Sequence, residues 1–362
     1  RRPRMSKAAE LAALIGSQTA LSNRNLVING AMQVAQRATS ASAKSSAGYH
    51  VVDRFRFVNN TSTGAVDIEQ STTVPAGQGF GSSLKVSTST AKATLTGTNE
   101  FGIQQRIEGQ NLQSLNYGTS SASKSTLSFW VRSNKTGTYV VWLYQTGNNR
   151  NIQKQFTISS ADTWEKKELT IDGDTSGSLA NDNSNELEFF IVLGTGPDRS
   201  SGTAPTTWQT LDNADRYVGQ TVNILDSTSN NFYLTGVQLE VGEQATPFEH
   251  RSFGDELARC QRYFQTMTKT GYMAGRGNGT TSVSDCRIPT ATVLRASPTI
   301  AGGSWFMSKQ DGTTLYTGSG ESYSVQNVSS QGVVTDISGI TNGTDNAVMV
   351  IAVTDVTLDA EL

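Results

Sequence analysis

Four aromatic side chains offer the clearest chemistry in this sequence, because flat apolar rings can stack on sugar rings. Alternation along the predicted strands places Trp130, Trp142 and Tyr144 on the strand face that points away from the core. Trp208 lies in a polar loop at 195–212. We expect these residues to be candidate glycan contacts, with amide and carboxylate groups as partners at the rim. The alternative is that a neighbouring loop or subunit buries the rings.

Catalytic motifs give little support to an enzyme. The chain has only two histidines, His50 and His250, which lie far apart in the sequence. It contains no G-x-S-x-G elbow, no H-E-x-x-H pair and no P-loop pattern. The clustered glycines of 271–279 follow no βαβ unit, so they predict a loop rather than a phosphate cradle. We therefore expect a protein that is not an enzyme.

Carboxylates leave two questions open. Two carboxylates that hydrolyse a glycan are recognised by their distance in space and not by their spacing in the sequence. The acidic residues of this chain can therefore be interpreted either as such a pair or as solvated surface residues. The available acids are Asp53, Glu108, Asp172, Asp174, Glu186, Glu188 and Glu240. The turn at 172–174, together with Asp182, could hold a structural calcium ion, although no EF-hand loop is present. We otherwise expect no metal and no cofactor.

Composition favours β-structure. Hydrophobic residues make up 36% of the 362 residues and charged residues only 17%, with 34 glycines. Low charge and abundant turn residues are typical of an all-β protein. With a net charge of −2, the chain lacks the excess of basic residues that is typical of nucleic-acid-binding proteins. No apolar run approaches the roughly 20 residues of a membrane span, and Cys260 and Cys286 make no disulfide framework.

Regularly spaced strands predict a large jelly-roll β-sandwich, because no βα alternation interrupts them. The best of these strands are 83–87, 101–107, 126–133, 139–144, 154–158, 165–171, 187–193, 221–224 and 232–241. In the third of them, Leu127, Phe129 and Val131 should point to the core and Trp130 away from it. The fourth and seventh are apolar on both faces, as expected for central strands that are covered on their second side.

The stretch 232–264 joins this large β-rich part to a smaller one. In its strand, Tyr233, Val237, Leu239 and Val241 fall on one face at period two. Gly242 and Pro247 then end the strand.

A helix should follow this strand. Ser252 and Asp255 form a capping-box pattern at its start. Leu257, Cys260 and Phe264 then recur at helical spacing. Cys260 is therefore expected to be a buried free thiol on the apolar face of this helix.

Four parts follow from these patterns. Residues 1–25 form an N-terminal arm with a short helix, whose apolar stripe contains Leu11, Leu14 and Ile15. Such a short helix is marginal alone, so this stripe is a candidate surface for attachment or oligomerisation. Residues 26–250 form the jelly-roll domain, 251–266 the connector helix and 267–362 a small C-terminal β-sandwich.

Three stretches, taken as an ordered set, resemble a known family. They are NLVINGAMQVAQR…YHVVDRFRF, QQRIEGQNLQSLNYG…LSFWVRSNKTGTY and FYLTGVQLEVGEQATPFEHRSFGDELARCQRYFQ. The set resembles tail-fibre and related virion structural proteins of tailed bacteriophages, of the marine and cyanobacterial phage type. The central domain of these proteins resembles the jelly-roll carbohydrate-binding modules. The match covers roughly residues 5–265, and the C-terminal part carries no motif that extends it.

This resemblance implies a homotrimeric virion protein. The arm would attach to other virion proteins, and the β domains would contact host-surface polysaccharide for host attachment and receptor binding. The N-terminus shows no apolar stretch with a small-residue cleavage site, so we expect synthesis in the host cytoplasm without a signal peptide. Two alternatives remain open, a head-decoration or fibre protein of the capsid and a glycan-binding module of a polysaccharide-active enzyme.

Overall fold

The computed structural model describes residues 23–267, 271–277, 282–309, 314–319, 322–329, 332–338 and 348–362. The predicted helix of the N-terminal arm, with Leu11, Leu14 and Ile15, lies outside the described residues. The chain forms two compact units, which we call unit 1 and unit 2, with their boundary between Arg251 and Ser252.

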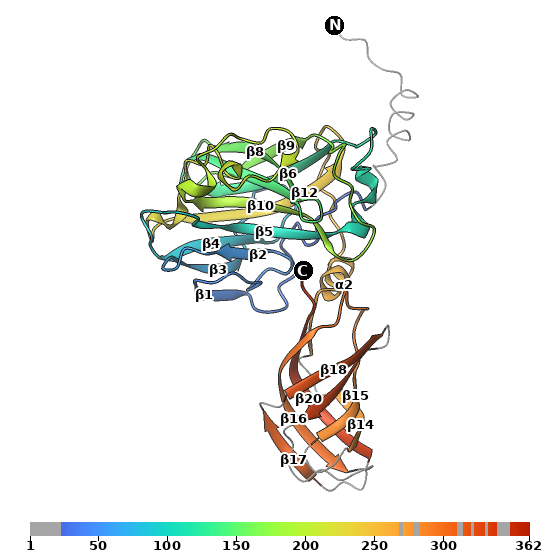
Figure 1. The fold of residues 1–362 in the computed structure, drawn as a ribbon. Helices are drawn as coiled ribbons and strands as arrows, with labels where there is room; N and C mark the ends of the chain where they lie inside the picture. The colour runs from blue at the N-terminus through green and yellow to red at the C-terminus, as the bar shows by residue number, and fades with distance from the viewer. Residues whose placement is uncertain are drawn as a thin grey trace. The chain divides into compact units, whose positions relative to one another are not determined.

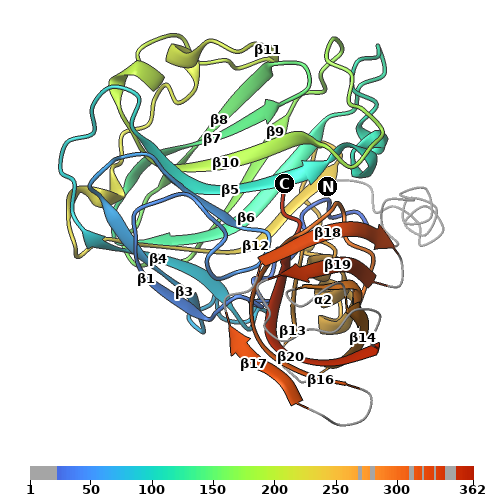
Figure 2. The same ribbon diagram turned by 60° about the horizontal axis from the view of Figure 1, so that its bottom comes forward.

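Unit 1 consists of two six-stranded antiparallel sheets that pack face to face as a β-sandwich (Figures 1 and 2). Sheet A has the order β1 (Ser40–Lys44), β3 (Ala65–Ser71), β4 (Ser83–Thr90), β12 (Asn231–Val241), β6 (Ser125–Ser133) and β9 (Glu165–Ile171). Sheet B has the order β11 (Gln209–Thr210), β8 (Arg150–Ile158), β7 (Gly137–Gln145), β10 (Asn185–Thr195), β5 (Glu100–Glu108) and β2 (Arg56–Asn59). Single turns of 3-10 helix lie at Gly109–Asn111, Gln113–Leu115, Pro197–Arg199, Asn213–Asp215 and Ile224–Asp226.

The core lies between the two sheets and follows the predicted alternation. Leu127, Phe129 and Val131 are buried in it, while Trp130 is turned outward and is partly exposed. Strands β7 and β10 are apolar on both faces, as predicted, because their outer faces carry a second buried cluster. That cluster contains Val140, Trp142, Phe190, Val192 and Tyr217. The all-β jelly-roll prediction is confirmed.

Two predictions for strands of unit 1 are wrong. The segment predicted as a strand at 221–224 runs into a 3-10 turn, because the Asn223 side chain accepts a hydrogen bond from Leu225 N at 3.0 Å and caps that turn. Tyr233 does not share a face with Val237 and Leu239. A bulge lies between Thr235 and Gln238, where Gly236 has a φ of 62°, and it reverses the alternation. Tyr233 therefore faces outward.

The N-terminal segment of unit 1 is fixed to this bulge by one amide side chain. Asn25 Nδ2 donates to Val237 O at 3.1 Å, and Asn25 Oδ1 accepts from Leu239 N at 3.1 Å and from Val27 N at 3.0 Å. Backbone hydrogen bonds from Leu26 N to Leu239 O and from Val237 N to Gly30 O continue the contact. We call this arrangement the Asn25 clamp.

Unit 2 begins with α2 (Phe253–Gln261), and this predicted helix is confirmed. The Ser252 hydroxyl accepts from Asp255 N at 3.2 Å, as the capping-box pattern predicts, and it also donates to Asp255 Oδ2 at 2.7 Å. The helix ends before Phe264, which instead begins a strand. Cys260 is a buried free thiol. No helix in the described part of the chain is long and apolar enough to cross a bilayer.

Eight strands complete unit 2 and are joined in one antiparallel sheet (Figures 1 and 2). They are β13 (Phe264–Met267), β14 (Gly271–Gly277), β15 (Ser282–Ile288), β16 (Thr299–Lys309), β17 (Thr314–Ser319), β18 (Ser322–Ser329), β19 (Gly332–Ser338) and β20 (Val348–Asp359). The loop predicted from the clustered glycines at 271–279 is wrong at 271–277, the part of this range that the structure describes. Strand β14 pairs with β20 there, because a ladder of backbone hydrogen bonds does not need side chains.

Replacement of Asn25 tests the clamp. Asn25→Ala leaves Leu239 N–H, Val237 C=O and Val27 N–H without their buried partner, so we expect the free energy of unfolding of unit 1 to fall by about 3 kcal/mol. Urea unfolding followed by tryptophan fluorescence measures this change. Asn181→Ala, at an exposed asparagine, is the control and should be close to neutral. Equal stability of the two variants would contradict the structural role of the clamp.

Candidate functional site

The four aromatic candidates from the sequence do not lie on one surface. Trp142 and Tyr144 belong to β7 and face outward from sheet B, whereas Trp130 belongs to β6 and faces outward from sheet A. Trp208 is only 8% exposed, packs edge-on against Tyr117 and donates from Nε1 to Asp172 O at 2.7 Å. Trp208 is thus part of the packed interior, which corrects its assignment as a glycan contact.

Strand register places polar and aromatic side chains in two rows on the outer face of sheet B. Trp142 is paired with Phe190, which is paired with Gln104, which is paired with Arg56. In the neighbouring row, Tyr144 is paired with Glu188 and Glu188 with Arg106. Residues at paired positions of one face are neighbours, so the four strands β7, β10, β5 and β2 present these seven side chains together.

A groove of about 200 Å³ lies on this face. We call it the sheet-B groove. Its lining residues are Arg56, Val58, Glu100, Gln104, Arg106, Trp142, Glu188, Phe190, Arg216 and Tyr217. Arg216 and Tyr217 come from the long loop between β11 and β12, which therefore forms one wall of the groove.

Trp142 supports the groove from below. Its side chain is only 2% exposed, and its Nε1 donates to Asn151 Oδ1 at 3.0 Å. The Arg216 guanidinium lies 4.1 Å from the ring centroid, and the Tyr144 ring stacks beside it at 4.9 Å with an interplanar angle of 11°. Tyr144 itself is partly exposed. Of the two candidates on β7, Tyr144 offers the accessible ring and Trp142 holds it in place.

Charged groups of the groove are held in pairs. Arg106 Nε lies 3.3 Å from Glu188 Oε2, and Arg56 Nη1 donates to Gln104 Oε1 at 3.1 Å. On the loop side, Arg216 Nη2 lies 3.5 Å from Glu100 Oε2. The planar ends of these side chains are thus oriented before any ligand arrives.

Burial changes the titration of two of these groups. Burial raises the pKa of the Glu188 carboxyl, and the charge of Arg106 opposes this shift. Burial, followed by the nearby charge of Arg106, lowers the pKa of Arg56. The protein therefore holds ionisable groups in this groove at a cost in solvation, which is common where such groups have a functional role.

Sequence reasoning missed most of the groove. Arg56 alternates with buried phenylalanines in the sequence, but its neighbours Gln104, Arg106 and Arg216 carry no recognisable motif. Only the pairing of β2 with β5 and of β5 with β10 brings them together. Strand pairing between segments far apart in the chain leaves no local signal.

The predicted calcium ligands do not gather in the structure. Asp174 is buried and accepts hydrogen bonds from Arg150 Nε at 2.6 Å and from Gln145 Nε2 at 2.9 Å. Asp172 lies near Lys124 and Lys154, and Asp182 caps Ser184. Among the described residues, no group of three or more His, Cys, Asp or Glu side chains could hold a metal ion.

Comparisons with known proteins do not assign a family. No protein-family model matches the chain, and no curated protein matches its sequence. Several solved structures are similar in part. The enzymatically active domain of tailspike protein 4 of bacteriophage CBA120 is 12% identical, with 60% of this chain and 22% of that chain covered and a TM-score of 0.32.

Two sugar-related structures are similar at the same level. A putative sugar binding protein from Bacteroides thetaiotaomicron is 14% identical over 60% of this chain and 100% of that chain, with a TM-score of 0.34. A family 11 carbohydrate-binding module of a Clostridium thermocellum cellulase is 11% identical over 57% of this chain and 98% of that chain, with a TM-score of 0.29. At these values none of the three assigns a function to this chain.

Replacement of Glu188 tests its altered titration. The pKa of Glu188 is higher in the folded protein than in the unfolded chain, so the folded protein binds this proton more tightly. Protonation of Glu188 therefore stabilises the folded state fully below the ordinary glutamate pKa of 4.5, and this stabilisation is lost as the pH rises through the pKa of the folded protein. The difference in unfolding free energy between wild type and Glu188→Gln should therefore decrease as the pH rises from 4.5 towards neutrality. Urea unfolding at a series of pH values measures it.

Glu243→Gln controls for the loss of one negative charge, since this carboxylate side chain is 70% exposed. A difference between wild type and Glu188→Gln that grows with rising pH would contradict the expected sign.

Proposed function

We propose that unit 1 binds polysaccharide through the sheet-B groove. The observation that carries this proposal is the row Tyr144, Glu188 and Arg106 on three adjacent strands, next to the row that ends in Gln104 and Arg56. An aromatic ring beside planar amide, carboxylate and guanidinium groups matches a sugar, which has apolar C–H faces and a rim of hydroxyl groups.

Each group has a specific part in this binding. The ring of Tyr144, which lies at the edge of the groove beside Trp142, stacks on one pyranose residue. Arg106 and Arg56 donate hydrogen bonds in a fixed fork to neighbouring hydroxyl groups, and Gln104 and Glu188 accept from them. Because the ion pair of Arg106 with Glu188 already orients both side chains, less conformational entropy is lost when the sugar binds.

The groove is open enough for an internal part of a chain. Its floor crosses four strands, and strands of a sheet lie about 4.8 Å apart, so the face is wide enough for more than one sugar residue. The proposed role is binding without catalysis, and many weak contacts from several copies would supply the overall avidity.

We further propose that the chain is a structural component of a phage particle, as a tail fibre or a fibre-like appendage. The support is the ordered resemblance of three sequence stretches between residues 5 and 265 to virion proteins of tailed phages. In this proposal the stripe Leu11, Leu14 and Ile15 attaches the chain to other virion proteins, the chain is a homotrimer, and the β domains contact host-surface polysaccharide.

Affinity electrophoresis in gels that contain purified bacterial capsular polysaccharides tests the groove. Retardation of the wild-type chain is the expected result. Tyr144→Ala and Arg106→Ala should each weaken binding about tenfold or more, because they remove a stacking face or a charged donor. Tyr144→Phe keeps the ring and should bind nearly as well as wild type.

Arg132→Ala on sheet A is the matched control for Arg106→Ala and should leave this binding unchanged. If wild type, Tyr144→Ala and Arg106→Ala all migrate alike on every polysaccharide, the groove is not a glycan site.

Light scattering tests the proposed assembly. We expect the mass of a trimer for the full chain and also for a version that starts at Asn23. The truncation begins at Asn23 because Asn23 N and Asn25 N both donate hydrogen bonds to Glu249 and so belong to unit 1. A trimer in both cases leaves the arm available for attachment. Monomers in both cases would contradict the fibre proposal.

A further inference from the structure

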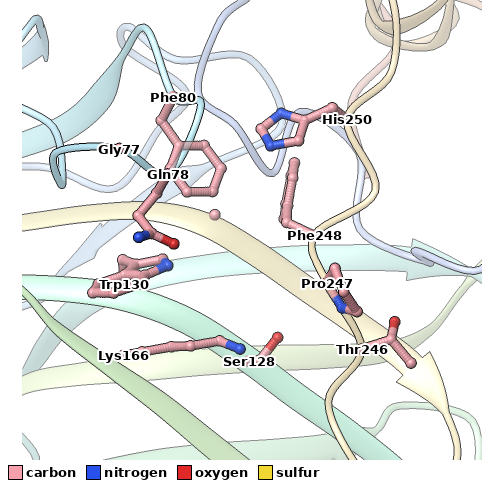
Figure 3. A pocket seen from close by; sticks show the side chains of 11 residues that line it. Gly77, Gln78, Phe80, Ser128, Trp130, Lys166, Thr246, Pro247, Phe248 and His250 are labelled. Atoms are coloured by element: carbon pink, nitrogen blue, oxygen red, sulfur yellow. The ribbon is translucent and has the colours of Figure 1, made fainter.

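A second cavity lies on the outer face of sheet A. It has a volume of about 230 Å³, and its floor is formed by β6, β9 and β12 (Figure 3). Two loops form its walls, the turn between β3 and β4 and the segment that follows β12. The lining residues are Gly77, Gln78, Phe80, Ser128, Trp130, Lys166, Gly236, Thr246, Pro247, Phe248 and His250. We call it the Trp130 pocket.

The bulge in β12 makes room for this pocket. Gly236 has a φ of 62°, which side chains rarely adopt, and a Cβ atom there would lie 2.6 Å from Phe80 Cζ and 3.1 Å from Trp130 Cδ1. Only glycine lets both rings approach the strand at this point. Bulges are common where a sheet forms a binding site, because they redirect side chains.

One wall of the pocket is aromatic. The rings of Phe80 and Phe248 meet edge-to-face with centroids 5.0 Å apart, and the His250 ring lies 5.2 Å from Phe80 and 4.9 Å from Phe248. In Figure 3 these three side chains lie together on one side of the cavity. They provide an apolar surface for one face of a ligand.

Partly buried hydrogen bonds hold this wall in place. Thr246 N donates to Glu240 Oε1 at 2.9 Å, and Thr246 Oγ1 donates to Glu240 Oε2 at 2.6 Å. Glu249 N donates to Gln238 Oε1 at 2.8 Å. The segment 246–250 is therefore fixed at both ends to the side chains of β12 that lie just after the bulge.

The side of the cavity opposite the aromatic wall is polar. Figure 3 shows the Ser128 hydroxyl, the Gln78 amide and the indole nitrogen of Trp130 turned toward the cavity. Ser128 is only 4% exposed, and no hydrogen bond from another described residue reaches the side-chain polar atoms of these three residues. These polar atoms can therefore form hydrogen bonds with a ligand in the cavity, because no protein group has to be displaced first.

The charge of the pocket is balanced. Lys166 lines the floor, and its Nζ lies 2.7 Å from Glu168 Oε1 on the same strand. The ammonium group can still donate its other hydrogens to a neutral acceptor. The phenylalanine, tryptophan, amide and hydroxyl groups of the lining carry no charge, so they suit a ligand with neutral oxygen atoms.

We propose that the Trp130 pocket is a second glycan site, which takes a single neutral pyranose residue at the end of a chain. An apolar wall opposite a floor of hydrogen-bonding groups fits a ring with one C–H face and several hydroxyl groups. The cavity of about 230 Å³ has room for one sugar ring. Loops wall it on two sides, whereas the sheet-B groove, which has a similar volume, is walled by a loop on one side only.

This site does not depend on the sheet-B groove. The groove and the pocket lie on the outer faces of different sheets, and they share no lining residue. An extended chain would use the groove, and a chain end would use the pocket.

The indole N–H resonances of the full chain, in two-dimensional ¹⁵N NMR spectra, test this proposal. Millimolar methyl glycosides of glucose, galactose, mannose and N-acetylglucosamine serve as probes of a chain end. Trp130→Phe and Trp142→Phe assign the two resonances that matter. We expect at least one glycoside to shift the Trp130 signal and to leave the Trp142 signal unchanged.

Ser128→Ala then tests the floor. It removes a hydroxyl that has no described protein partner, so the folded state should be as stable as wild type while the affinity for the glycoside falls about tenfold. Trp164→Phe is the matched control, because Trp164 lies outside the pocket lining and packs against Tyr233. It should bind as wild type does.

The two glycan proposals can fail separately. If none of the glycosides shifts the Trp130 signal, or if Ser128→Ala binds as tightly as wild type, the pocket is not a sugar site. Retardation of the same chain by a polysaccharide would then still support the groove. A shift of Trp142 alone would overturn the pocket as well.

Discussion

The Asn25 clamp is the interaction on which the rest of unit 1 depends. A single amide satisfies the Val237 carbonyl and the Leu239 amide of β12 and the Val27 amide of its own segment, and thereby joins the first described segment of the chain to the last strand of the sandwich. Gly30 lies against the same point, since a Cβ atom there would be 2.1 Å from Val237 O. Backbone groups in a bulge have lost their ladder partners, so a buried side chain must replace them.

Two carboxylates, the buried Glu240 and the partly buried Glu249, extend this constraint beyond the bulge. Glu240 accepts from Gln238 and Thr246, and Glu249 accepts from the backbone of Asn23 and Asn25. The same network therefore closes the sandwich and positions the segment that carries Phe248 and His250. Stability and the shape of the Trp130 pocket thus have a common origin, and a change that loosens the clamp should alter both.

The two outer faces of the sandwich differ in how far their tryptophan rings are covered. On sheet B, Trp142 is covered by Arg216 and Tyr144, so its indole stabilises a row of charged planar groups. On sheet A, Trp130 remains partly exposed at the bottom of a pocket closed by two loops. One face is suited to a broad polar contact and the other to an enclosed one.

The sequence by itself determined strands β4 to β10 and β12, the helix after Ser252 and the inward alternation of Leu127, Phe129 and Val131, because these features depend on neighbours in the chain. It also identified Trp130, Trp142 and Tyr144 as outward residues. Only the tertiary structure decided that Trp130 and Trp142 belong to different sheets, that Trp208 is interior and that Tyr233 is turned outward by the bulge. The partners of these residues, such as Arg216 and Phe80, lie on distant segments. Periodicity reports which side of a strand a residue occupies, whereas strand pairing and loop packing decide what it meets there.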